Sequence, residues 1–135
     1  MKFLSEEWFE EFRAITMDTF SPGKTPTGVT TSLCECYSDV PLAGGEKLWM
    51  MYVFENGVLT SLERGLGESS IPSAEYTSDA TYDIVVKLLK GEMANAKAVL
   101  SGKVKLKGNV TKALKLISTH DYIDKCKHLG GKTEW

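Results

Sequence analysis

The sequence of 135 residues lacks the features that would mark a membrane-spanning or secreted protein. Its longest unbroken apolar run is residues 48–54, far short of the ~20 residues that a membrane-spanning helix needs. Acidic residues stand at positions 6 and 7, where a signal peptide would have its apolar stretch, so we do not expect secretion. Three cysteines do not make a framework of disulfides, and we expect a reducing, cytoplasmic location.

Basic residues are few in one half of the chain and numerous in the other. Residues 1–80 hold 13 acidic and 5 basic side chains, whereas residues 81–135 hold 11 basic and 5 acidic ones. The sequence has only two arginines and a net charge of −2, which disfavours nucleic acid as a partner. The basic half is either ordinary solvated surface or a contact for something anionic, such as a membrane surface.

Motifs of enzymatic chemistry are absent from the sequence. It has no Gly-x-Ser-x-Gly, no phosphate-binding glycine loop and no dinucleotide fingerprint, so we expect neither catalysis nor a cofactor. Cys34 and Cys36 fall on one face of a predicted strand, but a zinc site needs further ligands, and only Cys126, His120 and His128 are available. We therefore interpret the two cysteines as small buried hydrophobic residues and expect no metal.

The first half of the chain has the pattern of one helix followed by strands. Ser5 and the two acids after it predict a helix start, and apolar residues at spacings of three and four continue for about four turns. Residues 29–37 and 47–54 have strand composition. The Asn-Gly pair at 56–57 predicts a tight hairpin to a partner strand at 58–63.

The second half is mostly helical in pattern, with two more strands. Residues 74–78 predict a strand, and the helix after it ends at Gly91. A short helix ending at Gly102 leads to a strand at 103–107, and residues 109–129 predict two amphipathic helices. Strands come mostly early and helices mostly late, which is typical of a single α+β domain.

The stretch 88–116 resembles the sterol carrier protein type 2 family. That family shows a helix ending in Leu-x-x-Gly, here 88–91, then a short helix and Gly-Lys, here 102–103. An alternating strand leads to Gly-Asn at 108–109 and to a helix with the pattern seen at 113–116. The three glycines at these separations carry the resemblance through about a third of the chain.

The resemblance implies one lipid-binding domain over residues 1–135. Its expected fold is α+β: a five-stranded, mainly antiparallel sheet with helices packed on one face, enclosing an apolar tunnel. The converging aliphatic side chains of the second half are the candidate lipid-binding residues: Ile84, Leu88, Val99, Leu100, Leu106, Leu114 and Ile117. A site of this kind holds its ligand by burial of apolar area.

The expected function is non-enzymatic binding or transfer of a lipid, with a fatty acid, a fatty acyl conjugate or a sterol-like amphiphile as cargo. Without the resemblance, the same apolar stripes would be typical of any protein core. An interaction or dimerisation module with a vestigial pocket is the alternative. It is supported by residues 48–54, which are apolar on both faces of a strand, so that one face needs cover from a partner or a second copy.

Three lysines share one face of the predicted strand at 103–107. Lys103, Lys105 and Lys107 alternate there with Val104 and Leu106. The lysines either contact anionic membranes transiently during lipid exchange or are ordinary solvated surface. The sequence leaves both interpretations open.

Overall fold

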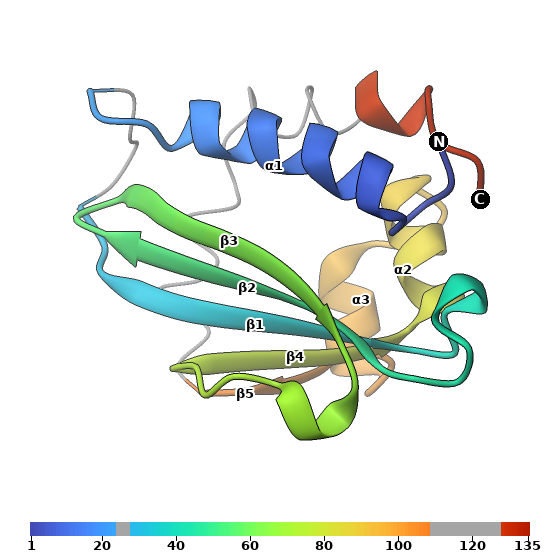
Figure 1. The fold of residues 1–135 in the computed structure, drawn as a ribbon. Helices are drawn as coiled ribbons and strands as arrows, with labels where there is room; N and C mark the ends of the chain where they lie inside the picture. Colours follow the sequence, from blue (N-terminus) through green and yellow to red (C-terminus); the bar gives the residue numbers. More distant parts are fainter. Residues whose placement is uncertain (24–27, 109–127) are drawn as a thin grey trace.

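The computed structural model describes residues 1–23, 28–108 and 128–135 (Figure 1). Two short 3₁₀ turns, η1 (Pro41–Ala43) and η2 (Glu68–Ser70), lie in the connections. The helices and strands, in chain order, are α1 (Glu6–Thr19), β1 (Thr31–Ser38), β2 (Leu48–Glu55), β3 (Val58–Leu66), β4 (Tyr76–Thr81), α2 (Tyr82–Leu89), α3 (Asn95–Leu100) and β5 (Lys105–Lys107).

The five strands form one sheet in the order β3-β2-β1-β4-β5. This confirms the predicted α+β class and the five strands. The expectation of a mainly antiparallel sheet needs correction, because the sheet is mixed: β1 and β4 run parallel at its centre, whereas the other neighbours are antiparallel. The cause is the segment 67–75, which carries the chain from the β3 edge past β2 and β1, so that β4 enters in the direction of β1.

The predicted hairpin joins β2 to β3. Asn56 and Gly57 have φ values of 50° and 81°, the left-handed conformation that a tight two-residue hairpin turn requires. The helix start at Ser5 is also confirmed, since its hydroxyl accepts a hydrogen bond from the Trp8 backbone N–H. These local signals place α1 and the hairpin correctly.

Helix α1 packs on one face of the sheet, which we call the inner face (Figure 1). Two arginine side chains fix its position: Arg13 Nε donates to the Leu62 carbonyl at 2.9 Å, and Arg64 Nε donates to the Leu4 carbonyl at 3.0 Å. The buried side chains of α1 are Trp8, Phe9, Phe12, Thr16 and Thr19.

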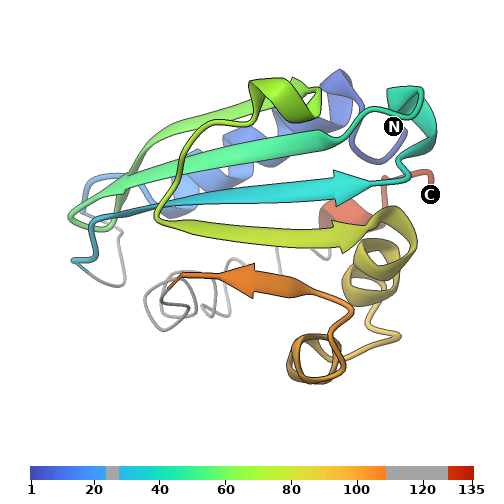
Figure 2. The same cartoon turned by 90° about the horizontal axis from the view of Figure 1, so that it is seen from below.

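The opposite, outer face of the sheet is crossed by the segment 67–75 (Figure 2). Trp49 Nε1 donates to the Ser70 hydroxyl at 3.1 Å, and the Glu75 backbone N–H donates to the Ser32 hydroxyl at 2.9 Å. A Cβ at Gly65 would overlap the Trp49 ring, so glycine lets this ring lie flat on β3. The chain therefore supplies some of the cover that the outer side of β2 needs, and cover by a second copy stays a prediction.

The helices predicted at 109–129 fall mostly outside the described residues, so nothing is concluded about them. Within the described ranges, no helix combines the length and apolar character needed to cross a bilayer.

Candidate functional site

The strand register shows which side chains lie on the inner face of the sheet, and we describe these side chains in two groups. Met50 of β2 lies beside Glu35 of β1, and the same row continues through Ser78 of β4 to Leu106 of β5. Side chains in one row point to the same face of a sheet. The inner side chains of β2 and β3 therefore form one half of this face, and those of β1, β4 and β5 form the other.

Most of the half formed by β2 and β3 is closed to solvent, and we call its buried side chains the sealed half. Arg64 and Leu66, at the end of β3, share this face but are half-buried and exposed, respectively. Its aromatic side chains meet those of α1: the Phe12 ring lies edge-on to Tyr52 at 6.4 Å between centroids, and Phe20 lies edge-on to Phe54 at 5.3 Å. The sealed half consists of six side chains, all buried: Leu48, Met50, Tyr52, Phe54, Leu59 and Leu62.

The half formed by β1, β4 and β5 is only partly buried. Thr31 and Tyr37, near the two ends of β1, and Tyr76 on β4 are closed to solvent. Between and beside them lie five half-buried side chains, which we call the open half: Leu33, Glu35, Ser78, Ala80 and Leu106.

A carboxylate stands in the middle of the open half. Burial raises the pKa of the Glu35 carboxyl above its ordinary value, while hydrogen bonds from the Tyr52 and Tyr37 side chains act in the opposite direction. A carboxyl held by two phenols keeps acceptor positions for a further donor. The open half therefore combines apolar side chains with one polar group suited to the head of an amphiphile.

A second polar group nearby has no partner. Tyr76 is only 2 % exposed, and among the described residues nothing hydrogen-bonds its buried hydroxyl. The backbone packs tightly here: Gly108 has φ of +100°, and a Cβ on it would overlap the Glu75 carbonyl oxygen. Buried hydroxyls nearly always have a partner, so an orphaned one marks a place where a ligand atom or a water fits.

The residues predicted from sequence are distributed over three environments. Leu106 belongs to the open half, and Ile84 and Leu88 lie half-buried one turn apart on α2. Val99 and Leu100 are exposed at the surface of α3. Leu114 and Ile117 lie outside the described residues. The described residues do not show an enclosed tunnel, and lining of one by the seven predicted residues stays a prediction.

Sequence reasoning missed Glu35, although the sequence contains its signal. The alternation that turns Leu33 and Tyr37 toward the core turns Glu35 the same way, so a charged residue falls on the buried side of a central strand. Charged side chains at such positions are rare unless they are paired or functional.

Cys34 and Cys36 are buried on the outer face, as predicted for small hydrophobic residues. Their sulfurs lie 3.9 Å apart, and both thiols are free. The hydrogen bond between them, together with burial, raises the pKa of Cys34, which therefore remains a thiol. Within the described part of the chain, no three potential ligands are grouped around a point where a metal could bind.

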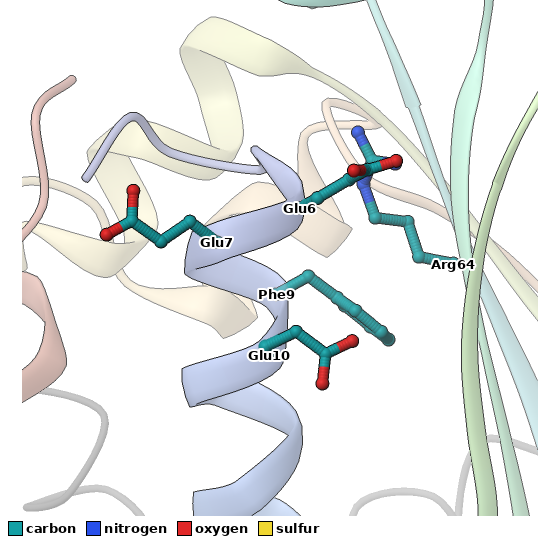
Figure 3. Close-up of a pocket in the computed structure, with 5 residues that line it drawn as sticks. All are labelled: Glu6, Glu7, Phe9, Glu10 and Arg64. Carbon is teal, nitrogen blue, oxygen red and sulfur yellow. The ribbon is translucent and has the colours of Figure 1, made fainter.

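A surface hollow of about 360 Å³ lies at the start of α1 (Figure 3). Glu6, Glu7 and Glu10 line it together with Phe9 and Arg64, and the Arg64 guanidinium is 4.0 Å from a Glu6 carboxylate oxygen. A hollow lined by three glutamates does not suit an apolar chain. This hollow is therefore distinct from the open half and is not a lipid site.

Comparison with solved structures identifies the fold of the chain. A crystal structure of sterol carrier protein 2 matches with a TM-score of 0.69 at 16 % identity, over 93 % of this chain and 98 % of its own. The chain has the sterol carrier protein 2 fold. Palmitated sterol carrier protein 2 like 2 from Aedes aegypti matches with a TM-score of 0.60 at 18 % identity, over 89 % of this chain and 97 % of its own.

The same fold also occurs as part of an enzyme. A double mutant of the sec-alkyl sulfatase PisA1 matches 84 % of this chain with a TM-score of 0.53 at 19 % identity, but the match covers only 16 % of the sulfatase. No family model matches the chain, and no curated protein matches it by sequence. At these identities the similarity shows the fold but does not identify the ligand. The ligand has to be inferred from the residues of the site.

Proposed function

We propose that this protein binds a single-tailed amphiphile against the open half of the inner face. The observation that carries the proposal is the contrast in exposure across one sheet face: α1 covers the buried side chains of the sealed half, whereas Leu33, Ser78, Ala80 and Leu106, which lie around Glu35, are only half-buried. Aliphatic side chains favour a hydrocarbon tail, since burial stabilises by about 25 cal/mol per Å² of apolar surface. The palmitated neighbour of the same fold supports a fatty acyl chain as cargo.

The polar groups in and beside the open half support an amphiphile rather than a pure hydrocarbon. Glu35 offers acceptor positions and the Tyr76 hydroxyl offers a donor or an acceptor, so a head group with hydrogen-bonding atoms would satisfy both. Fatty acids, fatty acyl conjugates and sterol-like alcohols all have such heads.

The proposed role is binding or transfer rather than catalysis. Among the described residues, the open half contains one carboxylate and hydroxyl groups but neither histidine nor cysteine, and the two described cysteines are on the outer face. That set suits recognition of a head group better than nucleophilic chemistry. A cytoplasmic location, expected from the three cysteines of the sequence, is part of the proposal.

Native mass spectrometry of protein purified under mild conditions tests this function. We expect a 1:1 adduct with the mass of a single-tailed lipid, which is lost on delipidation and restored by incubation with palmitic acid. A protein that has no adduct before or after incubation would overturn the proposal. The same spectrum reports subunit number, so dimers without lipid would favour the alternative of an interaction module.

A further inference from the structure

Two adjacent apolar side chains are exposed at the C-terminal end of α3. Leu100 is 89 % exposed, the highest value among the large hydrophobic side chains described, and Val99 is 41 % exposed. The turn after the helix fixes this arrangement, because the backbone N–H groups of Lys103 and Val104 both donate to the Ala98 carbonyl, at 2.9 and 3.1 Å. Ala98 is therefore buried at the end of the helix, whereas the two residues that follow it, Val99 and Leu100, are exposed.

Four lysines lie close to this apolar pair in the chain. Lys97 lies one turn before Leu100 on the same side of α3, and Lys103 follows directly after the helix. Lys105 and Lys107 are on β5, the edge strand next to α3 (Figures 1 and 2). We call these four lysines together with Val99 and Leu100 the basic corner.

The charges of the basic corner are not neutralised within the described part of the chain. All four lysines are exposed, and none of them has an ion-pair partner among the described residues. The register brings Asp79 beside Lys105, but that carboxylate is already paired with Lys47 at 3.3 Å. An anionic partner at the basic corner would therefore meet lysines that have no ion-pair partner among the described residues.

We propose that the basic corner docks on an anionic lipid membrane, with Val99 and Leu100 entering the boundary between head groups and acyl chains. The charge and the apolar pair are complementary to the two layers of such a surface, which is negative outside and apolar a few ångströms below. The inference rests on the proposed function, because a protein that exchanges lipid has to collect its cargo from a membrane.

The test uses flotation of the full chain with phosphatidylcholine vesicles, with and without phosphatidylglycerol. We expect association with the anionic vesicles only, falling as salt rises. Replacing both apolar residues, Val99→Ser with Leu100→Ser, should weaken association about tenfold. Reversing two charges, Lys103→Glu with Lys107→Glu, should weaken it by at least about tenfold and flatten its salt dependence.

Two matched controls separate the basic corner from general surface effects. Leu42→Ser removes an exposed leucine on η1, and Lys132→Glu reverses an exposed lysine near the C-terminus. Both controls should float like the parent, and thermal melting should confirm that every variant is folded. Parent protein that ignores anionic vesicles, or controls that lose as much association as the corner variants, would overturn the proposal.

A cargo titration on the same proteins in solution distinguishes this inference from the proposed function. The Lys103→Glu with Lys107→Glu variant supports membrane docking if it binds a fluorescent fatty acid like the parent but floats poorly. Parent protein that binds the fatty acid without floating overturns docking alone. Parent protein that floats but does not bind the fatty acid overturns the proposed function. The basic corner would then still be a membrane contact.

Discussion

The two halves of the inner sheet face have similar strands but different surroundings. In the sealed half, aromatic rings of α1 and β2 interlock, with Phe12 against Tyr52 and Phe20 against Phe54, and the side chains are closed to solvent. In the open half, smaller or polar side chains such as Ser78 remain half-buried. The comparison indicates that stability is concentrated under α1, and that the open half is where the sheet can accept a ligand.

The largest expected effect is a difference in stability between the halves. Leu62→Ala should lower the free energy of unfolding by about 2–5 kcal/mol, because Leu62 is 1 % exposed and its removal leaves a cavity beneath α1. Leu33→Ala should cost about 1 kcal/mol, since Leu33 is half-buried. Denaturant unfolding of delipidated protein measures both, and equal losses would remove the distinction between the halves.

A change at Glu35 should alter how stability depends on pH. Its pKa in the folded protein is raised above the ordinary value, so protonation favours the folded state, and that contribution is lost as the pH rises through the raised pKa. Glu35→Gln has no charge to bury, so its stability relative to the parent should increase from about pH 4 upward. Unfolding curves across this range test it.

Glu55→Gln is the matched control for that experiment, because Glu55 is an exposed carboxylate at the end of β2. Its stability relative to the parent should show a smaller change with pH. A Glu35→Gln curve that stays parallel to that of the parent at every pH would mean that Glu35 is as well solvated in the folded protein as in the unfolded chain.

The smallest expected effect concerns the orphaned hydroxyl. Tyr76→Phe removes a buried group that has no partner among the described residues, so the apo protein should keep its stability within about 1 kcal/mol or gain slightly. Cargo affinity should fall if a head group uses this hydroxyl, and a fatty-acid titration measures that. A clear loss of apo stability would show that the hydroxyl is bonded in the protein without ligand.

Much of the fold was predictable because its signals are local. Ser5 begins α1 through its own side chain, Asn56 and Gly57 supply the left-handed turn, and alternating lysines placed β5. The parallel pairing of β1 with β4 was not predictable in this way. It depends on where the segment 67–75 crosses the sheet, and no short sequence pattern encodes that path.

The site was less predictable than the fold. Apolar spacing predicted Val99 and Leu100 as lipid-binding residues, which stays a prediction, but their exposure was not predicted. A six-residue helix buries only a narrow side, and here that side is occupied by Ala98. Spacing cannot tell which side of so short a helix meets the core. Glu35, in contrast, could have been found, because strand alternation alone turns its carboxylate inward.

The central claim is that the open half can accept a bulky group and the sealed half cannot, and two tryptophan substitutions test it directly. Leu33→Trp should keep the stability of delipidated protein within about 1 kcal/mol, because Leu33 is only half-buried and a larger side chain at this position can extend toward solvent. It should also weaken fatty-acid binding at least tenfold, a loss of ~1.4 kcal/mol. Leu62→Trp should cost about 1–3 kcal/mol of stability through overpacking, while its folded fraction binds cargo like the parent.

For each variant, a denaturant melt measures the stability and a fluorescent fatty-acid titration measures the binding affinity. The account predicts opposite profiles, with binding lost at Leu33 and stability lost at Leu62. Leu33→Trp protein that is as destabilised as Leu62→Trp, and that still binds the fatty acid like the parent, would contradict it.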